Sequence, residues 1–138
     1  MCPTVRILVI DDDEIVRSSM VIMLTAAGFA VSTAVNGRYG LECCEHQLPD
    51  LVITDILMPE CEGVETILEL RRRYADIPIL AISGGWRTNT PDLLELVAKL
   101  GATETLAKPF DSDDLLAAIE KCLSQERAVS HPARYALR

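Results

Sequence analysis

Residues 5–14 read VRILVIDDDE, an apolar run that ends directly against three aspartates and a glutamate. The apolar part is rich in Val, Ile and Leu, which is typical of a parallel strand that is covered on both faces. We expect Asp13 to be the N-cap of the helix that follows, with Glu14 favourable in its first turn. Capping does not account for Asp11 and Asp12, so these two carboxylates are candidates for a site at the end of the strand.

Short apolar runs of this kind recur along the chain. Four further runs lie at residues 29–34, 51–54, 77–82 and 103–107. They alternate with segments whose apolar residues have helical spacing. Five strands alternating with five helices indicate an α/β fold, in which a five-stranded parallel sheet has right-handed crossovers and helices on both faces.

Length and composition restrict the class of protein. A chain of 138 residues has room for one domain, and the regular pattern ends near Ser124, so we expect a domain over residues 1–124 and a flexible tail over residues 125–138. The net charge of −8 argues against a nucleic-acid surface, which needs clustered Lys and Arg. The first apolar run is too short for a signal peptide or a membrane span. We therefore expect a cytoplasmic protein that binds neither nucleic acid nor membrane.

The cysteines and histidines indicate no metal or disulfide framework. The five cysteines are scattered, and none forms a CxxC pair, which favours reduced thiols. Neither they nor His46 and His131 have the spacing of zinc ligands.

Polar side chains follow four of the five predicted strands. They are the acid pair Asp11 and Asp12, then Asp55, Ser83 and Lys108. The carboxyl ends of parallel strands meet at one edge of the sheet, which is where such folds bind ligands. Converging carboxylates repel one another unless a cation joins them, and Mg²⁺ is the natural partner for oxygen ligands. The pattern therefore predicts a magnesium site at this edge.

The same residues suit phosphoryl chemistry. Asp55 stands alone directly after its strand, which makes it the best candidate nucleophile for a phosphoryl group. Lys108 can pair with a phosphoryl oxygen, and the hydroxyl of Ser83 can donate to another. Arg17, by contrast, is expected to be a solvated helix residue.

Taken in order, these residues resemble the receiver domain of response regulators in two-component signalling. The resemblance spans residues 4–124 and implies a flavodoxin-like sheet of strand order 2-1-3-4-5. The matching residues are Asp11, Asp12, Asp55, Met58, Pro59, Ser83, Gly84, Lys108, Pro109 and Phe110.

The resemblance implies a role for each site residue. Asp55 would accept phosphate from a histidine kinase or phosphotransfer protein. Asp12 and Asp55 would bind Mg²⁺ directly, together with the backbone carbonyl of Leu57, and Asp11 would act through water. The peptide bond between Lys108 and Pro109 would be cis, which proline makes inexpensive.

The protein looks most like stand-alone receivers, such as chemotaxis regulators, which are signalling phosphoacceptors rather than enzymes. It would act by docking to an unknown protein target or by relaying phosphate, since only 14 residues follow Ser124. The apolar run at residues 93–100 covers more than one helical stripe, which leaves a partner-facing flank or a weak homodimer open.

The sequence departs from the family pattern in two respects. Thr105 stands where receivers usually have Tyr or Phe, the aromatic side chain that takes part in the conformational switch. Leu57 and Gly85 stand where polar side chains can orient a hydrolytic water, so we expect slow self-dephosphorylation.

Other functions fit the sequence less well. A haloacid-dehalogenase-type phosphatase would use Asp11 as nucleophile with Asp13 two residues further on, but it needs a later GDxxxD-type motif that the sequence lacks. A flavin binder of the same fold needs a phosphate loop rich in Ser, Thr and Gly. A P-loop is absent. A receiver-like module that serves only as an interaction surface would lack Asp55 or Lys108.

Overall fold

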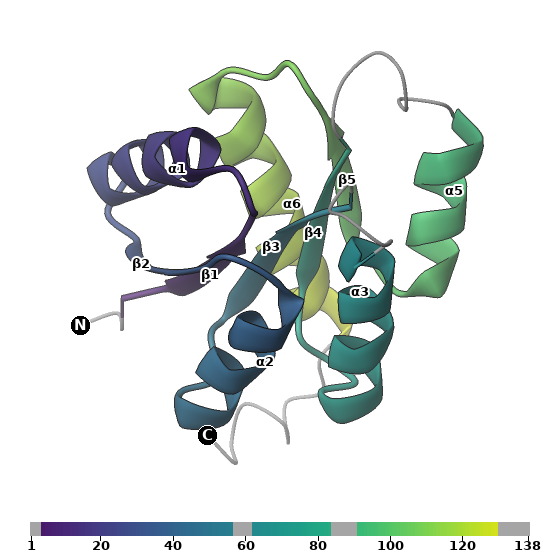
Figure 1. Cartoon of the computed structure of the whole chain (residues 1–138). Helices are drawn as coiled ribbons and strands as arrows, with labels where there is room; N and C mark the ends of the chain where they lie inside the picture. Colours follow the sequence, from purple (N-terminus) through teal and green to yellow (C-terminus); the bar gives the residue numbers. More distant parts are fainter. Residues whose placement is uncertain (1–3, 57–61, 84–90, 130–138) are drawn as a thin grey trace.

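The computed structural model describes residues 4–56, 62–83 and 91–129, and within these ranges it is a three-layer α/β fold (Figure 1). Five parallel strands form one sheet in the order β2-β1-β3-β4-β5, which confirms the predicted topology. The strands are β1 (Arg6–Ile10), β2 (Ala30–Ala34), β3 (Leu51–Asp55), β4 (Ile79–Ser83) and β5 (Glu104–Ala107). The helices are α1 (Glu14–Ala26), α2 (Gly37–His46), α3 (Glu62–Arg73), α5 (Pro91–Leu100) and α6 (Ser112–Val129).

The sheet separates two apolar cores. Successive side chains of β1 point to opposite faces, so Leu8 and Ile10 enter the core beneath α2, α3 and α5. Ile7 and Val9 enter the core beneath α1 and α6. Figure 1 shows the two helical layers on either side of the sheet. This double burial explains why the strand is a continuous apolar run rather than an alternating one.

The predicted element ends hold to within two residues for the strands but not for the last helix. We predicted that regular structure ends near Ser124, whereas α6 continues to Val129. Residues 125–129 carry no apolar stripe, but Gln, Glu, Arg and Ala have good helix propensity and extend an existing helix at little cost. Residues 130–138 lie outside the described part of the chain, so the flexible tail remains a prediction for them.

The strand register brings the predicted site residues to one edge. Ile10 is paired with Thr54, which sets Asp11 level with Asp55. Asp55 is paired with Ile82, and Ser83 with Ala107, the residue before Lys108. No helix in the described ranges is long and apolar enough to cross a membrane.

Candidate functional site

Three carboxylates gather at the carboxyl edge of the sheet. Asp11 and Asp12 follow β1, and Asp55 ends β3; one oxygen atom from each lies within 4.8 Å of the others. Asp11 and Asp55 are buried and Asp12 is exposed. Three carboxylate oxygens at this separation are the donor set that a hard divalent cation prefers, so the residues fit a magnesium ion.

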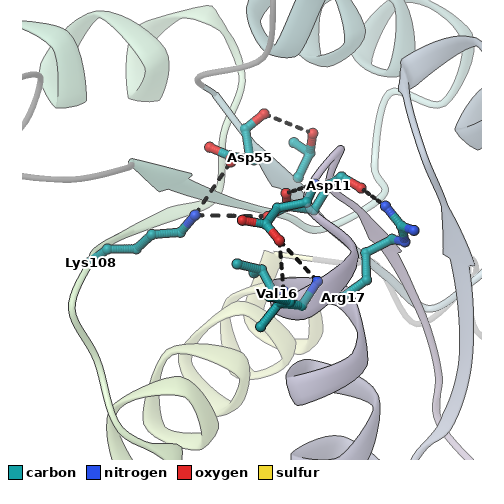
Figure 2. Close-up of polar contacts among 8 residues, drawn as sticks. Asp11, Val16, Arg17, Asp55 and Lys108 are labelled. Atoms are coloured by element: carbon teal, nitrogen blue, oxygen red, sulfur yellow. Dashed lines mark hydrogen bonds and ion pairs between the residues drawn. The ribbon is translucent and has the colours of Figure 1, made fainter.

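Lys108 follows the edge strand β5, and its side chain reaches this cluster. Its Nζ atom lies 3.4 Å from Oδ2 of Asp55 and 3.8 Å from Oδ2 of Asp11 (Figure 2). Both distances exceed the usual length of a charge-assisted hydrogen bond, so the ammonium group is shared between two carboxylates without a close contact to either. The backbone N–H of Lys108 donates to the carbonyl of Ser83 at 3.0 Å, which ties the ends of β5 and β4 together. The bond between Lys108 and Pro109 is cis, as predicted.

Burial and the neighbouring charges of the cluster shift the pKa of Asp11. Burial, together with the charges of Asp55 and Asp12, raises the pKa of Asp11 from 3.8 to about 6. The hydrogen bond from the Asp13 N–H and the charge of Lys108 oppose this rise in pKa but do not cancel it. A divalent cation would stabilise the ionised form, as expected for a carboxylate placed to bind metal.

The loop between β1 and α1 is held by hydrogen bonds to its own aspartates and by one side chain of the helix that follows. Oδ1 of Asp13 accepts from the N–H of Ile15 at 2.9 Å, which confirms Asp13 as the N-cap. The N–H of Asp13 in turn donates to Oδ1 of Asp11 at 2.9 Å. The reading of Arg17 as a solvated residue is wrong, because its Nη1 atom donates to the main-chain oxygen of Asp11 at 2.7 Å. Helical periodicity gave no sign of this contact.

Ser83 presents an unusual polar group. Its side chain is fully buried at the end of β4, and its Oγ atom has no hydrogen-bond partner among the described residues. Buried hydroxyls are nearly always paired, so an orphaned one beside Asp55 and Lys108 fits a ligand oxygen as its partner. Thr105 lies half-buried on β5, paired with Ala81 in the middle of β4.

The three carboxylate oxygens suit a metal ion. The ammonium group of Lys108 and the hydroxyl of Ser83, which has no partner among the described residues, suit a small anionic group bound beside that ion. The sequence independently matches the model of the response regulator receiver domain over residues 7–120. The chain belongs to the response regulator receiver family. The resemblance that its motifs indicated is therefore confirmed.

Known relatives of this receiver domain are similar to it in sequence. It is 39% identical over 121 residues to the response regulator MprA of Mycolicibacterium vanbaalenii, covering 86% of this chain and 50% of that protein. It is 36% identical over 124 residues to MprA of Mycobacterium leprae, covering 88% of this chain and 52% of that protein. The chain thus spans about half the length of the curated relatives it matches.

Two solved structures of similar proteins have the same fold as this chain. The chemotaxis response regulator CheY4 of Vibrio cholerae is 29% identical with a TM-score of 0.81, over 88% of this chain and all of that one. A response regulator receiver domain protein of Clostridium thermocellum is 28% identical with a TM-score of 0.82, over 91% of this chain and 99% of that one.

The receiver domain brings together Asp11, Asp12, Asp55 and Lys108, and it places Ser83 at the neighbouring strand end. Leu57 and the loop residues Gly84, Gly85 and Trp86 lie outside the described residues, as do the side chains at the start of α5.

One further residue that shapes the site was not predicted. Gly63 lies in the first turn of α3, and a Cβ atom there would be 2.3 Å from the carbonyl oxygen of Asp55 and 2.6 Å from Cα of Ile56. The role of Gly63 depends on the close approach of α3 to β3, for which periodicity gives no signal.

Proposed function

We propose that this receiver domain accepts a phosphoryl group on Asp55 from the phosphohistidine of a histidine kinase or phosphotransfer protein. The observation that carries the proposal is the place of the Asp55 carboxylate, which is 6% exposed, belongs to the three-aspartate cluster and lies 3.4 Å from Nζ of Lys108. Mg²⁺ would be held by Asp11, Asp12 and Asp55 together with the backbone carbonyl of Leu57.

The chemistry is a phosphoryl transfer. An oxygen of Asp55 forms a bond to phosphorus as the phosphorus–nitrogen bond of phosphohistidine breaks, and the imidazole leaves with the electron pair. Lys108 pairs with one phosphoryl oxygen, and the hydroxyl of Ser83 donates to another. Bound Mg²⁺ supplies a charge that offsets the negative phosphoryl oxygens.

The output is a change in a protein contact or onward transfer of phosphate, in the cytoplasm. The protein is then a signalling phosphoacceptor that turns over only its own phosphoryl group. The printed names of the relatives, response regulator MprA and chemotaxis regulator CheY4, support a signalling role of this class.

Acetyl phosphate and Mg²⁺ test the proposal without a kinase. Intact-mass measurement should show one phosphoryl group on the parent protein and none on Asp55→Asn, and peptide mapping should locate it on Asp55. Asp113→Asn, which removes an exposed carboxylate from the first turn of α6, is the matched control and should be labelled like the parent. Label that persists in Asp55→Asn, or that maps to Asp11, contradicts the proposal and favours the phosphatase reading.

A further inference from the structure

Arg17 lies one turn into α1, and its guanidinium reaches back to the loop that carries the acid pair. Nη1 donates to the main-chain oxygen of Asp11 at 2.7 Å, and the side chain is half-buried. Figure 2 shows Arg17 and Lys108 on opposite sides of Asp11. Lys108 faces the carboxylates, whereas Arg17 binds the main-chain oxygen of Asp11, so the contact of Arg17 does not involve the carboxylate oxygens.

The contact closes a ring of interactions around Asp12. Asp11 accepts at its carbonyl from Arg17 and at Oδ1 from the N–H of Asp13. Oδ1 of Asp13 accepts from the N–H of Ile15, which lies in the first turn of the helix that carries Arg17. The backbone on each side of Asp12 is therefore anchored to α1, and Asp12 sits at the apex of a loop that is fixed at both ends.

We propose that Arg17 is a positioning residue for the metal site, a role that rests on the proposed function. It holds the main chain of Asp11 so that the carboxylates of Asp11 and Asp12 stay directed toward Asp55. The carbonyl that it binds belongs to a residue with 2% exposure, so loss of the guanidinium would leave a buried acceptor short of a donor and let the loop relax. Arginine suits the task because its charge is permanent and its planar group offers several donors.

This role predicts the direction in which Mg²⁺ affinity should change when Arg17 is replaced. A positive charge that merely lies near the site would repel Mg²⁺, so its removal would tighten metal binding. A residue that orients metal ligands has the opposite effect, because changes to such partners typically weaken metal affinity by about ten- to hundredfold.

Isothermal titration with Mg²⁺ should compare the parent with Arg17→Met, which keeps an apolar stem and removes the donors, and Arg17→Lys, which restores a charged donor. We expect the Kd for Mg²⁺ to rise at least about tenfold in Arg17→Met and to stay within about threefold of the parent in Arg17→Lys. Arg72→Met, in the last turn of α3, removes an exposed arginine and should leave the Kd unchanged. Urea unfolding without Mg²⁺ confirms that each variant is folded.

Phosphorylation by acetyl phosphate supplies a second measurement. In Arg17→Met, the Mg²⁺ concentration for half-maximal rate should rise in step with the Kd, while the rate at saturating Mg²⁺ recovers most of the parent value. A Kd in Arg17→Met that equals or falls below that of the parent overturns the inference. If Arg17→Met does not fold, Arg17→Gln is judged by the same criterion. A parent protein that neither binds Mg²⁺ nor is labelled on Asp55 instead refutes the proposed function.

Discussion

The ammonium group of Lys108 lies 3.4 Å from Oδ2 of Asp55, although 53 residues separate the two in the chain. Lys108 follows β5 and Asp55 ends β3, and these two strands are not neighbours, because β4 runs between them. The long side chain of Lys108 therefore passes across the end of β4, where Ser83 is buried. The ammonium group thus lies beside the Asp55 carboxylate, and a buried hydroxyl lies at the end of the strand between β3 and β5.

Removing the lysine should separate metal binding from signalling. Lys108→Ala should bind Mg²⁺ at least as tightly as the parent, because Lys108 competes with the metal for the charges of Asp11 and Asp55. The same variant should lose most of the structural response to phosphorylation, since its phosphoryl oxygen has no ammonium partner. Calorimetric titration measures the first effect, and weaker Mg²⁺ binding in Lys108→Ala would show that the lysine is part of the metal site.

The raised pKa of Asp11 makes stability depend on pH in a definite direction. Its pKa is raised to about 6, first by burial and then by the charge of Asp55, so the folded state favours the protonated form. In Mg²⁺-free protein this group therefore lowers the free energy of unfolding as pH rises from about 4 to about 7. Asp11→Asn mimics the protonated form and keeps an acceptor for the N–H of Asp13.

We expect Asp11→Asn to raise the free energy of unfolding by about 2 kcal/mol at pH 7.5 and by much less near pH 4. Urea titrations in a chelator at both pH values measure the difference. In the parent protein, Mg²⁺ affinity should fall as pH is lowered through 6, because the proton competes with the metal for Asp11. A stability gain that is the same at both pH values would exclude ionisation of Asp11 as its cause.

The conformational switch should depend on Ser83 more than on Thr105. The hydroxyl of Ser83 has no partner in the described structure and is free to turn toward a phosphoryl oxygen, whereas Thr105 is too small to alternate between a filled pocket and the surface. Trp86, the only tryptophan, follows Ser83 by three residues. Its fluorescence should change when beryllofluoride and Mg²⁺ are added to the parent, and should not change in Asp55→Ala.

Two single variants distinguish a switch that depends on Ser83 from one that depends on Thr105. Thr105→Ala should keep most of the fluorescence change, and Ser83→Ala should lose much of it. The opposite pattern, a silent Ser83→Ala and an abolished response in Thr105→Ala, would show that the threonine carries the switch.

A methyl group at Gly63 should disturb the strand that carries Asp55. Alanine normally stabilises a helix relative to glycine, but here its Cβ would be 2.3 Å from the carbonyl oxygen of Asp55. We expect Gly63→Ala to lower the free energy of unfolding by about 1–3 kcal/mol and to slow labelling by acetyl phosphate. Glu65→Ala, an exposed site on the same helix, is the control and should change neither. A more stable Gly63→Ala would mean that α3 moves away at little cost.

Much of this protein could be predicted from local sequence because its strands are buried on both faces. Continuous Val, Ile and Leu runs mark such strands, and parallel alternation with helices places all their carboxyl ends on one edge. The polar residues at the ends of these strands, such as Asp11, Asp55 and Lys108, are then assigned to the site without knowledge of any distance. The N-cap role of Asp13 is equally local, since it depends only on the residues that begin the helix.

The contacts of Arg17 and Gly63 were decided only by the tertiary structure. Periodicity places Arg17 on a helix but does not show that the preceding loop turns its carbonyl toward the guanidinium. The need for glycine at position 63 depends on how closely α3 approaches β3. The end of α6 at Val129 was also not predicted, because no apolar stripe extends that far. An apolar pattern reports which side of an element is buried. Contacts between a side chain and a distant backbone group depend instead on loop path and helix placement, which are settled when the whole core packs.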